Sequence, residues 1–382
     1  MKIFYWSPFF TKVATISAVL NSAESLTKYK SKNDYNVTIL NAIGEWNDYK
    51  KGINKNVLIK DLFEKDFTKL IPKGNFIKSR LSYIFIFLAS LPKLLNLINK
   101  EKPDYFIIHL ITSLPIFLSP FFNKKTKIIL RISGLPKLNY LRRIFWKLYS
   151  NKFYKITCPT QSTLETIRES KIFDRSKIVL LRDPIISIKN IKSKINQITD
   201  KDLINKKYIL GIGRLTKQKN FALLLQFFFQ LNKKYPEYKL YILGEGEERI
   251  SLNNMLDKYK LKSKVFLLGH QNNVFNYLKY SECFILSSLW EDPGFVLAEA
   301  GAVNTNIISS DCPNGPKEII SNPEFLFSNN SCDDLMKKFE IYKNKPHTEL
   351  LKQKIDVKKR IKFFTSFQHY KNLNLILSEN NE

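Results

Sequence analysis

The sequence has 382 residues and a formal net charge of +28, with 44% hydrophobic and 25% charged residues. This length exceeds what one hydrophobic core usually serves, so it predicts two domains, and the composition excludes a disordered or fibrous chain. The four cysteines have no CxxC spacing. That excludes a disulfide scaffold or a cysteine zinc site, and we expect reduced thiols in a cytoplasmic protein.

Parallel sheets with helical crossovers are predicted along the first half, because short β-branched and aromatic runs alternate with helical patterns. The expected strands are Lys2–Trp6, Val37–Asn41, Asp104–His109, Lys127–Ser133, Lys155–Pro159 and Ile178–Leu181. The expected helices lie near Ala14–Lys30, Arg80–Lys100, Asn139–Asn151 and Ser162–Ser170. The most apolar stretch, Leu81–Ile98, is interrupted by Pro92 and Lys93, so we expect a buried or interfacial helix rather than a membrane span.

Positive charge is concentrated in this first half. Residues 1–200 hold 35 Lys and Arg against 14 Asp and Glu, and no acid lies between Asp104 and Glu165. Such a field attracts phospholipid, a lipid phosphate or nucleic acid. The segment Leu135–Lys155 mixes large apolar residues with six cations, which is typical of a helix lying on an anionic membrane, although a solvated basic face is an alternative. Because no nucleic-acid motif occurs, we expect no nucleic-acid partner.

A polar, weakly periodic segment then separates two alternating regions. Expected strands resume at Tyr208–Gly213, Lys239–Leu243, Val265–Leu268, Cys283–Ser287 and Asn306–Ser309. The predicted organisation is a domain at 1–184, a linker at 185–207, a second domain at 208–360 and a C-terminal helix at 361–382 that could pack back on the first domain. We expect an α/β protein with two Rossmann-like, doubly wound domains facing across a cleft, where ligands of open α/β sheets bind.

The strongest motif in the second half is a pair of glutamates, Glu291 and Glu299, on either side of Pro293-Gly294. Pro-Gly favours a helix start, which places Glu291 before the helix and Glu299 inside it. The backbone N–H groups of Gly294, Phe295 and Val296 would then face a diphosphate or sugar hydroxyls. Each carboxylate could accept both hydrogens of a diol, although a helix carrying two acids explains the pair alone equally well.

Two further turns follow predicted strands. After Gly211 and Gly213 come Arg214 and Lys219, which can neutralise a pyrophosphate where glycine lets the backbone approach it. Gly244, in the sequence LGEG, follows the next strand, and a plain tight turn is its alternative explanation.

The segments GRLTKQKNF, LYILGEGEE, FLLGH, SSLWEDPGFVLAEA and DCPNGPKEI occur in this order and together resemble glycosyltransferase family 4, of the retaining GT-B enzymes. The resemblance implies that Glu291 contacts the donor sugar and Glu299 the ribose, that Arg214 and Lys219 bind the diphosphate, and that Gly269 and His270 border the nucleobase. His109, at a predicted strand end, would lie near the donor sugar. The sequence departs from the family at one place near the sugar contacts, because the usual second glycine after the first glutamate is absent here.

The resemblance implies transfer of a hexose or N-acetylhexosamine from a nucleotide-sugar, with a UDP-sugar expected, to a lipid-linked or polysaccharide acceptor in surface glycan synthesis, at the cytoplasmic face of the membrane. It also implies that no cofactor or metal is required, because protein cations and a helix N-terminus neutralise the leaving diphosphate. The alternatives are another GT-B chemistry, such as a nucleotide-sugar epimerase, and a basic nucleic-acid-binding protein.

Overall fold

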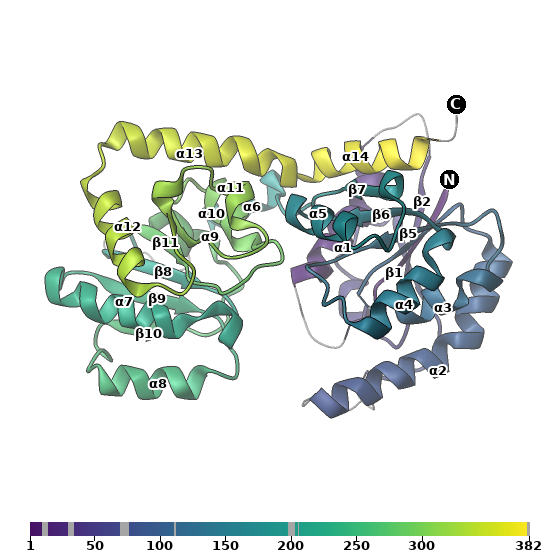
Figure 1. Cartoon of the computed structure of the whole chain (residues 1–382), viewed down its shortest axis with the longest axis horizontal. Coiled ribbons are helices and arrows are strands. Elements are labelled where there is room, and N and C mark those ends of the chain that lie inside the picture. Colours follow the sequence, from purple (N-terminus) through teal and green to yellow (C-terminus); the bar gives the residue numbers. More distant parts are fainter. Residues whose placement is uncertain are drawn as a thin grey trace. The chain divides into compact units, whose positions relative to one another are not determined.

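The structure is a computed structural model that describes residues 1–9, 14–29, 34–68, 76–110, 112–197, 203–204 and 206–379, without the side chains of residues 14 and 76–83. It consists of two compact units (Figure 1). Unit 1 comprises Met1–Pro184 and Ser366–Glu382, and unit 2 comprises Ile185–Thr365. Each unit is an α/β domain built on one parallel sheet, which confirms the predicted fold class.

The sheet of unit 1 has seven strands in the order β3-β2-β1-β4-β5-β6-β7. The strands are β1 (Lys2–Trp6), β2 (Asn36–Asn41), β3 (Val57–Asp61), β4 (Tyr105–Ile108), β5 (Lys127–Arg131), β6 (Phe153–Cys158) and β7 (Ile178–Leu180). The helices are α1 (Ala14–Lys28), α2 (Phe76–Glu101), α3 (Ser113–Leu118), α4 (Tyr140–Leu148), α5 (Gln161–Glu169) and α14 (Ser366–Ser378).

The sheet of unit 2 has six strands in the order β10-β9-β8-β11-β12-β13. The strands are β8 (Tyr208–Ile212), β9 (Lys239–Leu243), β10 (Val265–Leu267), β11 (Cys283–Leu286), β12 (Ile307–Ser310) and β13 (Leu326–Phe327). The helices are α6 (Ile188–Asn196), α7 (Phe221–Lys234), α8 (Arg249–Lys258), α9 (Phe275–Tyr280), α10 (Phe295–Ala302), α11 (Pro316–Ile319), α12 (Cys332–Asn344) and α13 (His347–Ile361).

Alternate residues of each strand in unit 1 enter different cores, because successive side chains of a strand point to opposite faces. Ile3 and Tyr5 of β1 pack in a core shared with α1 and α14. Phe4 and Trp6 pack in a second core with α2, α3, α4 and α5. Both faces of the sheet are therefore covered, as all-parallel sheets require.

In each sheet, the order in which successive strands are added reverses beside the first strand of that sheet. In unit 2, β9 and β10 extend from one side of β8, and β11 then pairs with the other side. The crevice at such a reversal, outside the carboxyl ends of the strands, is where open α/β sheets bind ligands. The loops that follow β8 and β11 are therefore the first places to look for a site in unit 2.

Several elements differ from the expectations. The segment 185–207, expected to be a linker, carries helix α6, which belongs to unit 2 and buries Ile191 in its core. The pattern also missed the edge strand β3, whose residues apart from Val57 are largely outside the core. The C-terminal helix α14 packs against α1 within unit 1. Among the helices in the described part of the chain, none is long and apolar enough to cross a membrane.

Candidate active site

Lys219 lies at the carboxyl end of β8, where the residues that follow the strand position its side chain. Gly213 follows the strand, and a Cβ built on it would lie 3.1 Å from the Lys219 side chain. A short 3-10 helix, Lys217–Lys219, then turns the chain toward α7. Because glycine leaves room there, the apolar stem of Lys219 lies across the end of the strand and its ammonium reaches the neighbouring loop.

Glu291, from the loop after β11, is the partner of that ammonium. Lys219 Nζ lies 2.6 Å from Glu291 Oε1, and the side chain of Glu291 is only 4% exposed. Ser288 Oγ donates to the same carboxylate oxygen at 2.5 Å. The pairing of β8 with β11 thus joins two residues that lie 72 positions apart in the sequence. Ser288 was not singled out from the sequence, because a serine beside a strand end carries no distinctive signal.

The loop that carries Glu291 is fixed by a neighbouring turn. The backbone N–H of Glu291 donates to Pro313 O at 3.1 Å, and Asn314 Nδ2 donates to Asp292 Oδ1 at 2.8 Å. A Cβ on Gly315 would lie 2.1 Å from Pro293 O, so only glycine allows this approach. The motif DCPNGPKEI therefore supports the glutamate loop even though the usual second glycine is absent.

Helix α10 begins immediately after this loop. Its N-cap is Gly294, which adopts a left-handed conformation with φ of +83° and supplies no capping side chain. The first-turn N–H groups of Phe295 and Val296 therefore have no side-chain cap and lie at the positive end of the helix dipole. This arrangement suits an anion, and the contact of these two N–H groups with a diphosphate stays a prediction.

Glu299 lies one turn further along α10 and is half-buried. Burial raises the pKa of its carboxyl group to about 7, and the positive charge of Lys194 acts in the opposite direction. Lys194 belongs to α6, which is anchored by Asn273 Nδ2 donating to Lys194 O at 2.7 Å. The sequence interpretation missed Lys194 because it lay in the presumed linker.

The remaining predicted residues of unit 2 lie at the same edge of the sheet. Gly244 N donates to Gly269 O at 2.8 Å, so the ends of β9 and β10 are joined. A Cβ on Gly244 would lie 1.9 Å from Gly213 O, which connects this turn to the end of β8. His270 is exposed. Arg214 is also exposed, and within the described residues its side chain forms no hydrogen bond or ion pair.

His109 and Arg131 lie in the interior of unit 1, around a cavity of about 10 Å³ that Asp183 and His369 also line. His109 is 3% exposed, and burial lowers its pKa well below the usual value, helped by the charges of Arg131 and His369. Arg131 is equally buried and forms an ion pair with Asp183. The guanidinium of Arg131 is therefore engaged within the fold, and the catalytic role of His109 stays a prediction.

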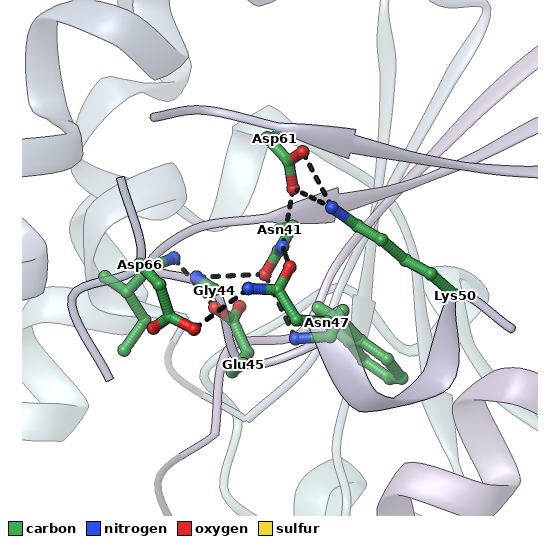
Figure 2. A network of polar contacts seen from close by, with 9 residues as sticks. Asn41, Gly44, Glu45, Asn47, Lys50, Asp61 and Asp66 are labelled. Carbon is green, nitrogen blue, oxygen red and sulfur yellow. Dashed lines mark hydrogen bonds and ion pairs between the residues drawn. The ribbon is translucent and has the colours of Figure 1, made fainter. Parts of the chain in front are cut away.

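A second polar network orders the loop after β2 (Figure 2). Asn41 Oδ1 accepts from the backbone N–H of Gly44 and of Trp46, at 3.1 and 3.0 Å, while its Nδ2 donates to Asp61. Glu45 turns inward and accepts from two backbone N–H groups, with burial raising its pKa to about 7. These bonds explain an ordered loop; the acids in it are engaged in the fold.

Sequence comparison identifies the family. The family model for "Glycosyl transferases group 1" matches residues 194–360, the stretch that contains every site residue of unit 2 described above. An uncharacterized glycosyltransferase of Methanocaldococcus jannaschii is 33% identical over 282 residues, covering 69% of each chain. The chain belongs to the group 1 glycosyltransferases. That family confirms the predicted enzyme class, a glycosyltransferase.

Two other similarities concern this glycosyltransferase. A Campylobacter jejuni enzyme is 29% identical over 217 residues, 54% of this chain and 57% of that protein; its name is N-acetylgalactosamine-N,N'-diacetylbacillosaminyl-diphospho-undecaprenol 4-alpha-N-acetylgalactosaminyltransferase. The crystal structure of Anabaena HepE in complex with UDP superposes with a TM-score of 0.73 at 11% identity, covering 99% of this chain and 100% of that one. The second similarity shows the fold alone.

Proposed function

We propose that this glycosyltransferase moves a hexose or N-acetylhexosamine from a UDP-sugar to a lipid-linked or polysaccharide acceptor, with retention of anomeric configuration. The observation that carries the proposal is the Lys219–Glu291 pair at the strand reversal of unit 2. It puts an ammonium group in direct contact with a carboxylate that can accept hydrogen bonds from sugar hydroxyls, at the place where α/β sheets bind ligands. The donor diphosphate would share Lys219 and also engage Arg214, which is exposed and has no partner among the described residues.

The carboxylate of Glu291 is suited to hold the donor sugar. Its Oε1 already accepts from Lys219 and Ser288. A carboxylate has about four lone-pair sites, so Oε2 remains to accept from sugar hydroxyls. Glu299 would accept from the ribose diol in its ionised form, which Lys194 favours. The similarly folded HepE was crystallised in complex with UDP, which supports uridine as the nucleotide.

We also propose that turnover needs no divalent metal. Two cations and the first turn of α10 can neutralise the leaving diphosphate without one, since charge-assisted hydrogen bonds to phosphate are the strong class. EDTA treatment followed by Mg²⁺ addition tests this. Activity that EDTA abolishes and Mg²⁺ restores would overturn it.

Association with an anionic membrane surface is part of the proposal. Helix α4 exposes Leu141, Ile144 and Leu148 to solvent, with Leu148 72% exposed, and carries Arg142, Arg143 and Lys147. Apolar and cationic side chains on one exposed helix suit an anionic bilayer. Flotation with anionic vesicles should carry the protein upward, and an Ile144→Asp, Leu148→Asp double variant should remain at the bottom. Equal flotation of both proteins would contradict this surface.

The decisive experiment is donor selection followed by product analysis. A thermal-shift screen of UDP-, GDP- and dTDP-sugars should raise Tm most with a UDP-sugar, because a bound donor stabilises the fold by mass action. Product NMR with an added acceptor then reports the anomeric configuration. An inverted product would refute retention, and a donor that changes its own sugar without acceptor would favour the epimerase alternative. Salt-sensitive DNA binding in place of donor binding would favour the nucleic-acid alternative.

A further inference from the structure

A groove in unit 1 lies at the carboxyl ends of β4 and β5, beside α4. It has a volume of about 670 Å³. Its apolar members include Pro136, Leu141, Phe145 and Trp146, and its polar members are Thr112, Ser113, Arg131, Ser133 and Arg142. The volume is in the range of ligand pockets, and the carboxyl ends of parallel strands are where such sheets bind ligands.

The polar groups of the groove favour an anion. Of the described residues that line it, none is acidic. Arg142 Nη1 donates to the backbone oxygen of Lys137, at 3.1 Å, and the guanidinium lies 5.9 Å from the centroid of the Trp146 ring. Ser133 Oγ is shielded from solvent and has no partner within the described part of the chain. The guanidinium of Arg142 has no carboxylate in the groove lining to pair with, and the hydroxyl of Ser133 is not hydrogen-bonded within the described residues. Together the two groups suit phosphate oxygens.

The apolar groups of the groove continue onto the surface. Leu141 lines the groove and is nevertheless 76% exposed, and Ile144 and Leu148 follow it on the same helix face. An exposed apolar stripe of this kind marks a binding surface. It begins beside Arg142, so one amphiphile could lay its chain on α4 and its phosphate against the guanidinium.

We propose that this groove binds the lipid phosphate or diphosphate end of a lipid-linked acceptor, with the first part of its hydrocarbon chain on α4. This inference rests on the proposed function and narrows its acceptor to the lipid-linked class. The apolar part of the wall favours an amphiphile over a purely polar glycan, because a glycan would gain nothing from Leu141 and Phe145.

Binding of farnesyl diphosphate to the full chain tests the proposal. The titration is done in saturating UDP, so that Arg214 and Lys219 do not capture the probe. Arg142→Ala should weaken binding by about tenfold or more, the loss expected for one charge-assisted hydrogen bond. Leu141→Asp should weaken it similarly without harming the fold, because an acid in the first turn of α4 agrees with the helix dipole. Lys147→Ala, outside the groove lining, should bind within about twofold of the wild type.

Farnesol and inorganic diphosphate, the two halves of the probe, show which part of the ligand the groove binds. Farnesol and inorganic diphosphate should each bind far more weakly than farnesyl diphosphate. Equal binding of inorganic diphosphate would mean a free-phosphate site, and equal binding of farnesol would mean an apolar groove without a phosphate contact; either result overturns the proposal. Binding to anionic vesicles without binding to farnesyl diphosphate would also overturn it, in favour of a membrane-contact surface. UDP-sugar binding, measured separately by thermal shift, shows whether the proposed function itself stands.

Discussion

Replacing Glu299 by glutamine tests the donor site through pH. The substitution preserves shape and removes the ionisable group. In the folded protein burial raises the carboxyl pKa from 4.5 to about 7. At 1.36 kcal/mol per pKa unit, keeping this group ionised in the folded state costs about 3 kcal/mol. A ligand that binds the ionised form would offset that cost.

The sign of the stability effect follows from linkage. The folded-state pKa lies above the unfolded one, so the folded protein binds more protons between pH 4.5 and about 7. The contribution of this carboxyl to stability is therefore present at low pH and is lost as the pH rises through 7. Relative to the wild type, Glu299→Gln should gain up to about 3 kcal/mol between pH 5 and pH 8 in urea unfolding. Glu45, whose pKa is also about 7, titrates equally in both proteins and cancels from the difference.

Donor affinity should change in the opposite sense. If only the ionised carboxylate accepts from the ribose, wild-type affinity for a UDP-sugar improves about tenfold from pH 6 to pH 8, because the ionised fraction rises by that factor around a pKa of 7. Glu299→Gln should bind more weakly at pH 8 and show no such slope. A wild type with flat donor affinity, or a variant with the same slope, would refute the role of Glu299.

Three further substitutions address other parts of the two units. Lys194→Met should raise the donor KM several-fold at pH 7, with recovery at pH 8.5 and an unchanged kcat, whereas Lys192→Met, exposed on the same helix, should behave as wild type. A Lys194→Met variant with the same kinetics as the wild type would remove Lys194 from the site. Arg131→Met leaves Asp183 buried without its partner and should destabilise unit 1 by about 3–5 kcal/mol, which thermal unfolding would report as a clearly lower midpoint. Gly315→Ala should lower kcat and raise the donor KM, because the added Cβ would displace the loop that carries Glu291; unchanged kinetics would show that the loop tolerates the shift.

The alternation of strands and helices, and the polar residues that follow the strands, could be recognised in the sequence. Short β-branched and aromatic runs predicted β1 and β11 with nearly their observed bounds, because strands that are buried on both faces have nearly continuous apolar sequences. The pattern failed at β3 and α6. The outer strand β3 buries little on either face, and the Lys- and Asn-rich α6 owes its place to side-chain bonds with the segment before α9, such as that from Asn273.

The sequence by itself determined that Lys219 and Glu291 follow strands and that Glu299 lies in the next helix, since residue type and order along the chain carry that information. Their part in donor binding stays a prediction. Only the tertiary structure decided that Lys219 contacts Glu291 directly, that the charge of Lys194 acts on the Glu299 carboxyl and that Arg131 forms an ion pair with Asp183. The physical reason is that strand order in a sheet and the docking of helices join positions far apart in the chain. Burial and electrostatic partners arise from those contacts, and a local sequence pattern does not encode them.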